Sequence, residues 1–188
     1  EFVPFDISQA GRFREAIAFA HRNTNSESPR FFVDIRPHPF QERILEALAA
    51  EREAGSVRNL VVAATGTGKT VIAAFDYARF LRENSGNSRL LFVAHRKEII
   101  IQARDCFRTV LRDQNFGELL VDGMGPIEWN HVFASVQSLN GHQPWNNLGT
   151  NYFDFVVIDE AHHGTASSYR PLLDHLLPKI LLGLTATP

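Results

Sequence analysis

Residues 59–70 read Asn-Leu-Val-Val-Ala-Ala-Thr-Gly-Thr-Gly-Lys-Thr, an apolar run that passes directly into glycine, lysine and threonine. The run 59–64 predicts a β-strand, and the amphipathic residues 69–82 after it predict a helix. Gly66 and Gly68 lie at the junction, where a backbone without Cβ can curl so that several N–H groups face one anion. The start of the helix adds positive partial charge at the same point. These residues therefore predict a strand–loop–helix unit that binds phosphate.

Lysine and threonine at the end of this loop supply the chemistry that a nucleotide needs. Lys69 can reach the β- and γ-phosphates, and the Thr70 hydroxyl can ligate Mg²⁺. The strict phosphate-loop pattern has glycine where this chain has Ala63. A glycine-rich turn without a ligand is the alternative, and the position between strand and helix favours the binding loop. The residues expected to bind nucleotide are Thr65, Gly66, Thr67, Gly68, Lys69 and Thr70.

The alternation of apolar runs and amphipathic helices continues on both sides of the loop. The runs that predict strands are 89–94, 118–121, 131–135, 153–158 and 179–184. The amphipathic segments that predict helices are 10–22, 41–54, 97–111 and 167–177. Strands that are apolar on both faces and alternate with helices indicate a parallel sheet covered on both sides. The predicted fold class is α/β.

A pair of carboxylates follows one of these apolar runs. Asp159 and Glu160 come directly after 153–158, in the order Asp-Glu-Ala-His. A carboxylate at the carboxyl end of a parallel strand faces the crevice where such sheets bind ligands. There Asp159 can hold Mg²⁺ through water, and Glu160 can orient and deprotonate an attacking water. Two acidic residues that cap a following helix are the alternative, which the phosphate-binding loop upstream disfavours.

Length and composition limit the class of protein. The 188 residues, 44% of them hydrophobic, suffice for one domain with a substantial core. A single cysteine excludes a disulfide framework and a zinc site of several thiolates, and it suits the reducing cytoplasm. No apolar run approaches the ~18 residues that span a membrane. The net charge of −2 gives no support for nucleic-acid binding, so that case must rest on local residues.

Together, the motifs resemble the first RecA-like domain of superfamily 2 helicases. Residues 63–70 match the helicase form AxxGxGKT, which accounts for Ala63, and 159–162 spell DEAH. Residues 185–188, Thr-Ala-Thr-Pro, match the family's coupling motif, and 36–41 are similar to its adenine-reading motif. The resemblance covers about residues 34–188 and leaves 1–33 as a predicted N-terminal helical extension. Two features resemble one branch of the superfamily: His163, the second histidine after Asp-Glu-Ala, and residues 95–98, His-Arg-Lys-Glu. This is the DNA-translocating branch, which includes the motor subunits of type I and III restriction enzymes.

The resemblance implies a RecA-like P-loop NTPase domain with a mainly parallel sheet, in which strand 179–184 lies between strands 59–64 and 153–158. It implies that Lys69, Asp159 and Glu160 are catalytic, with Thr70 and Asp159 as Mg²⁺ ligands. Gln41 and Arg36 are expected to form the adenine pocket, and a glutamine amide can bond adenine N6 and N7 together. The residues expected to couple hydrolysis to movement are His162, Thr185 and Thr187.

Polar residues at two other strand ends are candidates for contact with nucleic acid. Arg96 follows strand 89–94, and Ser135 and Gln137 follow strand 131–135. Positive charge, hydroxyl and amide groups suit backbone phosphates. Both segments match nucleic-acid-contacting motifs of the family in position. Solvated polarity at strand ends is the alternative.

The sequence therefore predicts an ATP-dependent helicase or translocase motor domain that uses ATP and Mg²⁺. The expected partners are nucleic acid, DNA more than RNA, and a second RecA-like domain that this chain lacks and that activity requires. The longer protein is expected to carry nuclease or recognition domains, in restriction or DNA repair. The alternatives are a module that binds nucleotide without turnover and a different phosphate-loop phosphotransferase. A GTPase is disfavoured because a guanine-reading Asn-Lys-x-Asp sequence is absent.

Overall fold

The structure of the chain is a computed structural model that describes residues 35–144, 147–160 and 166–187. The predicted extension 1–33, with its helix 10–22, lies outside the described residues. His162 of the DEAH sequence also lies outside them.

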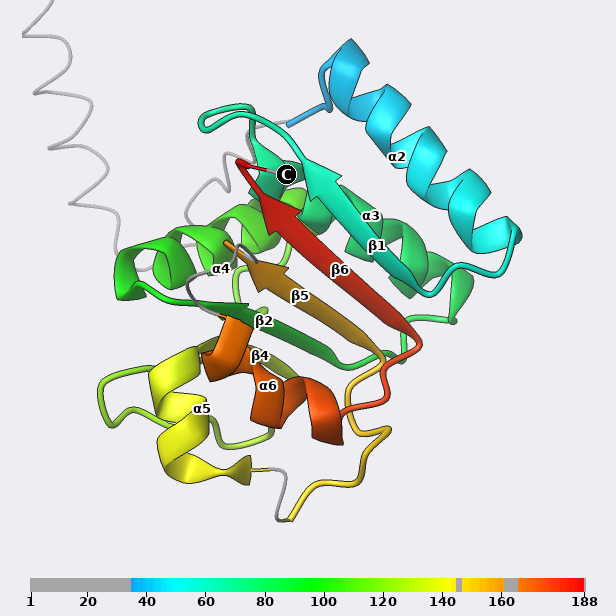
Figure 1. Cartoon of the computed structure of the whole chain (residues 1–188). Helices are drawn as coiled ribbons and strands as arrows, with labels where there is room; N and C mark the ends of the chain where they lie inside the picture. Colours follow the sequence, from blue (N-terminus) through cyan, green and yellow to red (C-terminus); the bar gives the residue numbers. More distant parts are fainter. Residues whose placement is uncertain (1–34, 145–146, 161–165, 188) are drawn as a thin grey trace, which may run out of the picture. The chain divides into compact units, whose positions relative to one another are not determined.

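The described residues build one sheet flanked by two layers of helices, drawn in Figure 1. The strands are β1 (Arg58–Val62), β2 (Leu90–Ala94), β3 (Glu118–Leu120), β4 (His131–Ser135), β5 (Phe155–Asp159) and β6 (Ile180–Thr185). Their order across the sheet is β1-β6-β5-β2-β4-β3, and all neighbours pair in parallel. The predicted α/β class and the predicted place of the last strand between the first and the acidic strand are both confirmed.

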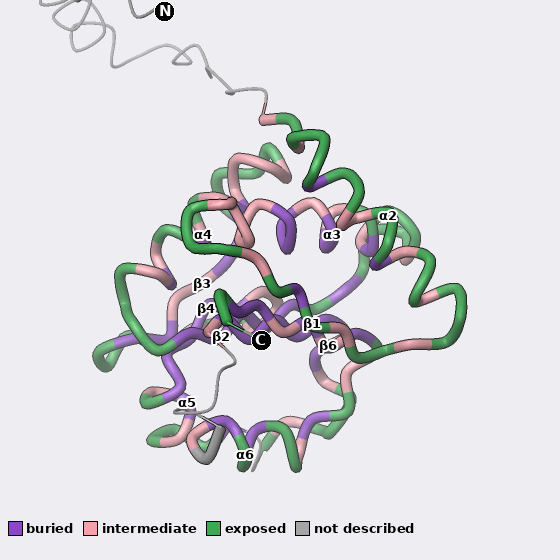
Figure 2. Tube along the Cα trace, turned by 45° about the horizontal axis from the view of Figure 1, so that its top comes forward, coloured by how far each residue is buried: buried purple, intermediate pink, exposed green. Residues whose placement is uncertain are grey.

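The helices cover both faces, as the apolar strands predict. The helices are α2 (Pro39–Glu53), α3 (Lys69–Glu83), α4 (Lys97–Leu111), α5 (Val136–His142) and α6 (Ala166–His175). Figure 2 shows α2, α3 and α4 on one side of the strands and α5 and α6 on the other. Because neighbouring strands run parallel, each connection must cross over the sheet, and α3, α4, α5 and α6 lie in four of these connections. Residues 121–130 join β3 to β4 without a helix, and α2 precedes β1.

Alternate residues of the central strands pack into two separate cores. In β2, Leu90, Phe92 and Ala94 join the core beneath α3 and α4, whereas Leu91 and Val93 join the core beneath α5 and α6. Strand β5 divides in the same way, with Phe155 and Val157 on one side and Val156 and Ile158 on the other. This period of two explains why these strands are apolar throughout.

Three local features differ from the sequence-based expectation. Helix α5 was not predicted, because residues 136–142 are too few for a clear helical period. Helix α2 begins at Pro39 rather than at residue 41, since proline is well tolerated at the first helical position. Strand β1 is at the edge of the sheet, and its Leu60 and Val62 are 57% and 46% exposed.

Among the described residues, no helix combines the length and the apolar character that crossing a bilayer requires.

Candidate active site

The loop between β1 and α3 has the backbone geometry that its glycines predict. Gly66 and Gly68 adopt φ of 81° and 77°, a left-handed conformation that costs glycine little. Gly68 is the N-cap of α3, so the first free N–H groups of the helix face the loop. Thr67 closes the turn, because its hydroxyl donates to the Ala64 carbonyl at 2.7 Å. The loop therefore has the backbone geometry of turns that bind anions at helix starts in other proteins.

The Lys69 ammonium is held over this loop. Its Nζ donates to the carbonyl oxygens of Ala63 at 2.8 Å and Ala64 at 3.3 Å. An ammonium has three donors, so these contacts leave one for a further acceptor. The main chain thus positions the positive charge where the loop N–H groups converge.

Gln41 fastens helix α2 to the loop. Its side chain is 3% exposed, its Nε2 donates to the Thr67 carbonyl at 2.9 Å, and its Oε1 accepts from the His38 N–H at 2.9 Å. A Cβ on Gly68 would lie 2.7 Å from Gln41 Nε2, so this contact also requires glycine at 68. The Gln41 amide has a second N–H and a second lone pair beyond those used in these contacts. Its predicted adenine-reading role stays a proposal.

The acidic pair lies at the end of β5. Asp159 is 7% exposed, and burial raises the pKa of its carboxyl above the usual value, with the nearby charge of Glu160 adding to the rise. Its Oδ1 accepts from the Glu160 N–H at 2.9 Å. Glu160 has φ of 58°, a left-handed conformation that is uncommon for a residue with a side chain. Strained backbone of this kind occurs preferentially at functional sites.

The loop and the acidic pair line one cavity of about 400 Å³, which we call the nucleotide cleft. Its lining residues are Thr65, Gly66, Gly68, Lys69, Thr70, Ile99, Gln102, Asp159, Glu160 and Ala186. Ile99 and Gln102, on α4, are absent from the sequence-based list. The sequence predicted only that both lie on the helix 97–111, and it gave no signal for this cavity.

The order of the strands brings the cleft together. Strand β6 lies between β1 and β5, with Thr185 opposite Val62 and Leu184 opposite Asp159. The Ala63 N–H donates to the Thr185 carbonyl at 3.1 Å, which ties the loop to the predicted coupling motif. The Thr185 hydroxyl donates to the Thr187 carbonyl at 2.7 Å and shapes the turn that follows β6. These contacts place the two threonines beside the cleft and leave their coupling role a prediction.

The cleft offers hard oxygen ligands for a divalent cation. The Thr70 hydroxyl and the Asp159 carboxylate line the same cavity, and carboxylate and hydroxyl oxygens are ligands that Mg²⁺ prefers. Among the described residues, no cluster of three or more histidine, cysteine and acidic side chains has the arrangement of a protein-only metal site.

Arg36 is exposed just before α2 and does not line the nucleotide cleft. Thr67 contributes turn contacts and does not line the cleft either.

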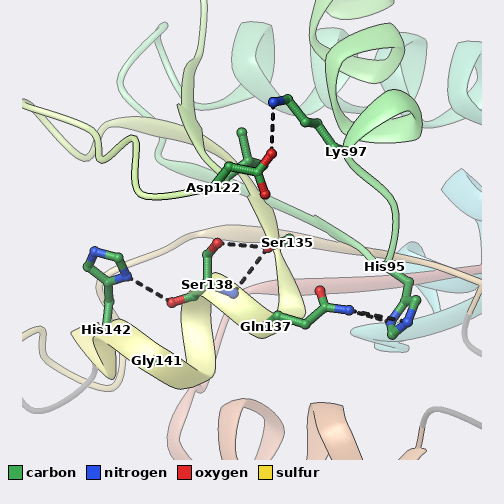
Figure 3. Close-up of a pocket in the computed structure, with 9 residues that line it drawn as sticks. His95, Lys97, Asp122, Ser135, Gln137, Ser138, Gly141 and His142 are labelled. Carbon is green, nitrogen blue, oxygen red and sulfur yellow. Dashed lines mark hydrogen bonds and ion pairs between the residues drawn. The ribbon is translucent and has the colours of Figure 1, made fainter.

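A second cavity, of about 640 Å³, opens where β2, β3 and β4 end, and we call it the polar pocket. Its lining residues are His95, Lys97, Val121, Asp122, Ser135, Gln137, Ser138, Gly141 and His142. Figure 3 shows Gln137 of α5 directed toward His95, with its amide nitrogen 3.1 Å from His95 Nδ1. Of the three residues predicted to contact nucleic acid, Ser135 and Gln137 line this pocket. Arg96 does not line it, although its neighbours in the sequence, His95 and Lys97, do.

Local contacts order the residues on two sides of the polar pocket. Ser135 caps α5, because its hydroxyl oxygen accepts from the Ser138 N–H at 3.0 Å. On the opposite side, Lys97 forms an ion pair with Asp122 at 2.7 Å, which raises the pKa of the Lys97 ammonium. The two side chains are 42% and 66% exposed, so water screens this pair and the pair contributes little to stability.

Comparison with known proteins identifies the family of the chain. Residues 34–188 match the family model described as type III restriction enzyme, res subunit. The chain belongs to that family. It is 33% identical to IRC3 of Saccharomyces cerevisiae, which carries the name of an ATP-dependent helicase, over 72% of this chain and 20% of that protein. It is 34% identical to the type I restriction enzyme EcoAI endonuclease subunit of Escherichia coli, over 71% of this chain and 17% of that protein.

Solved structures show the same fold. The UvsW helicase of bacteriophage T4 superposes with a TM-score of 0.66 at 18% identity, over 96% of this chain and 70% of that chain. The predicted RecA-like fold and the predicted family are confirmed. Because the chain spans only 20% and 17% of the two relatives, the family is established for this domain, whereas the activity of the longer protein is a matter of proposal.

Proposed function

We propose that this chain is the ATP-hydrolysing motor domain of a nucleic-acid helicase or translocase. The observation that carries the proposal is that Lys69, Thr70, Asp159 and Glu160, which come from two distant segments, line one cavity. Phosphoryl transfer needs little covalent help from a protein and depends on positioning and charge. A cation, a hydroxyl and two carboxylates around one space supply those requirements.

Each side chain has a distinct role in this proposal. The loop N–H groups and Lys69 bind the phosphates of ATP. Gln41 and Arg36 do not line the nucleotide cleft, and in this proposal they form the adenine pocket next to it. Thr70 and Asp159 would hold Mg²⁺, which when bound neutralises charge on the phosphate oxygens. Glu160 accepts a proton from the attacking water. The left-handed backbone at Glu160 turns the chain at the edge of the cleft, where its side chain is one of the lining groups.

Nucleic acid is the proposed partner, with DNA favoured over RNA. The polar pocket presents hydroxyl, amide and ammonium groups, which recognise a phosphate backbone rather than a base sequence. Relatedness to a restriction enzyme subunit supports DNA. We place residues 34–188 as the first of two RecA-like domains in a longer cytoplasmic protein with nuclease or recognition domains. The second domain would supply an arginine finger, which contributes about 10³–10⁵ to kcat in related phosphoryl transfer.

The test is Glu160→Gln in the complete protein that carries this domain. The carboxamide keeps the shape of the side chain but cannot accept a proton, so we expect Mg-ATP to bind normally and turnover to fall by about 10²–10⁴. Steady-state ATPase assays with duplex DNA, single-stranded DNA and RNA measure both the loss and the preferred partner.

Glu98→Gln is the matched control, because Glu98 is exposed on α4 and lines neither cavity. Wild-type turnover in the Glu160 variant would remove Glu160 from the role of base.

A further inference from the structure

The turn at Glu160 is secured from both sides of one peptide group. On one side, the Glu160 N–H donates to the Asp159 carboxylate at 2.9 Å. On the other, the Asp159 carbonyl accepts a hydrogen bond from the Tyr169 hydroxyl at 3.3 Å. Left-handed backbone in a residue with a side chain persists only when its surroundings hold it there. The peptide between Asp159 and Glu160 therefore depends on the residues that bind its two ends.

Tyr169 is well placed to hold this peptide. It is 2% exposed and packs in the core beneath α5 and α6, so its ring has little freedom. A tyrosine hydroxyl is protonated at neutral pH, so the group can donate to the Asp159 carbonyl. Tyr169 lies on α6, so its hydrogen bond to the Asp159 carbonyl joins this helix to the acidic pair.

Helix α6 is also bonded to the helix that lines the polar pocket. The Asn140 amide on α5 donates to the carbonyl of Ser168, the neighbour of Tyr169, at 3.1 Å. Val136 and Leu139 of α5 share a core cluster with Tyr169 and Leu172 of α6. Figure 1 shows these two helices side by side beneath the sheet. A shift of α5 would therefore act on the segment of α6 that holds the Asp159 carbonyl.

We propose that Tyr169 is a positioning residue for Glu160, and that Asn140 connects it to the polar pocket, so that a strand bound there favours the hydrolytic arrangement of Glu160. The proposal rests on the proposed function, since it assumes hydrolysis in the nucleotide cleft and nucleic acid in the polar pocket. Coupling of this kind requires an element that both sites bias, and the α5–α6 pair contacts both.

Tyr169→Phe in the complete protein tests the positioning role. It removes only the hydroxyl, so we expect nucleic-acid-stimulated kcat to fall about tenfold, as for other residues that orient a functional group. The KM for ATP should stay within about twofold, because the loop contacts persist.

Tyr77→Phe is the matched control for loss of a buried hydroxyl. Tyr77 is also fully buried, and its hydroxyl also donates to a backbone carbonyl, that of Ser88, at 2.8 Å. It should leave kcat unchanged, although both variants lose a comparable buried hydrogen bond. Equal kcat values in the two phenylalanine variants would overturn the positioning role.

Asn140→Ala tests the connection. We expect it to lower the ratio of stimulated to basal ATPase while basal ATPase is unchanged, and the double variant with Tyr169→Phe should show no further loss of that ratio. The control is Asn84→Ala, because Asn84 likewise donates to a helix carbonyl, that of Phe80, at 2.8 Å. An unchanged ratio in Asn140→Ala, or additive losses, would overturn the connection. Absence of nucleic-acid-stimulated turnover in the wild-type protein would instead overturn the proposed function and this inference together.

Discussion

The nucleotide cleft and the polar pocket open at the same edge of one sheet and are built in opposite ways. The nucleotide cleft combines left-handed backbone at Gly66, Gly68 and Glu160 with a buried carboxylate, Asp159. The polar pocket combines a capped helix, an amide and an exposed ion pair between Lys97 and Asp122. Phosphoryl transfer needs charges fixed before the reaction, whereas a moving strand needs contacts that exchange easily. The burial and backbone geometry of the two cavities therefore differ in the way that their two proposed tasks require.

The largest expected effect comes from removing one lysine charge from each cavity in turn. Lys69→Ala removes the cation held over the phosphate loop, so affinity for a fluorescent ATP analogue should fall by about 100-fold, the range for loss of a charge-assisted contact. Lys97→Ala removes the same charge from the polar pocket and should leave that affinity unchanged. Titration of both variants with the fluorescent ATP analogue measures the two affinities. Equal affinities in the two variants would show that the nucleotide lies elsewhere.

An effect of intermediate size concerns the stability cost of the buried carboxylate. Burial raises the pKa of Asp159, so the ionised form destabilises the folded, ligand-free domain at neutral pH. Asp159→Asn should therefore stabilise that domain at pH 7 and raise its Tm. The gain should shrink as the pH falls through the raised pKa and vanish near the ordinary carboxyl pKa of about 3.9.

Asp122→Asn is the control for that measurement, because Asp122 is exposed and its ion pair is screened. Its effect on unfolding free energy should stay within about 0.5 kcal/mol. Thermal unfolding of both variants between neutral and acid pH compares the two cavities directly. A destabilised Asp159 variant would mean that the carboxylate supports the fold rather than the function.

The smallest expected effect belongs to a neutral contact. Gln137 is exposed, and its neutral amide contacts the His95 ring. Gln137→Ala should weaken single-strand binding about threefold, the cost of one ordinary hydrogen bond. The dependence of affinity on salt should not change, because no charge is lost. Lys97→Ala should instead reduce the slope of log affinity against log salt by about 0.7. Identical slopes for the two variants would show that Lys97 does not contact the phosphates of the strand.

Local sequence was sufficient for the parts of the molecule that carry a short-range signal. The glycines and Lys69 predicted the turn between β1 and α3, and the apolar run before the carboxylates predicted the strand that ends at the acidic pair. The bounds of α4 agree with the prediction at both ends, since residues 97–111 carry a complete helical period. In each case backbone preference and the period of apolar residues act within a few positions along the chain.

Contacts between distant segments depend on strand order and helix packing, which no local period records. Gln102 reaches the nucleotide cleft only because α4 packs beside the loop, and Gln41 meets Thr67 only because α2 lies against the start of α3. Helix α5 is too short to show a period, and its start depends on the Ser135 cap. The bond between Tyr169 and Asp159 likewise exists only because α6 folds back beneath β5, where burial fixes the side chain and its single polar atom must find a partner.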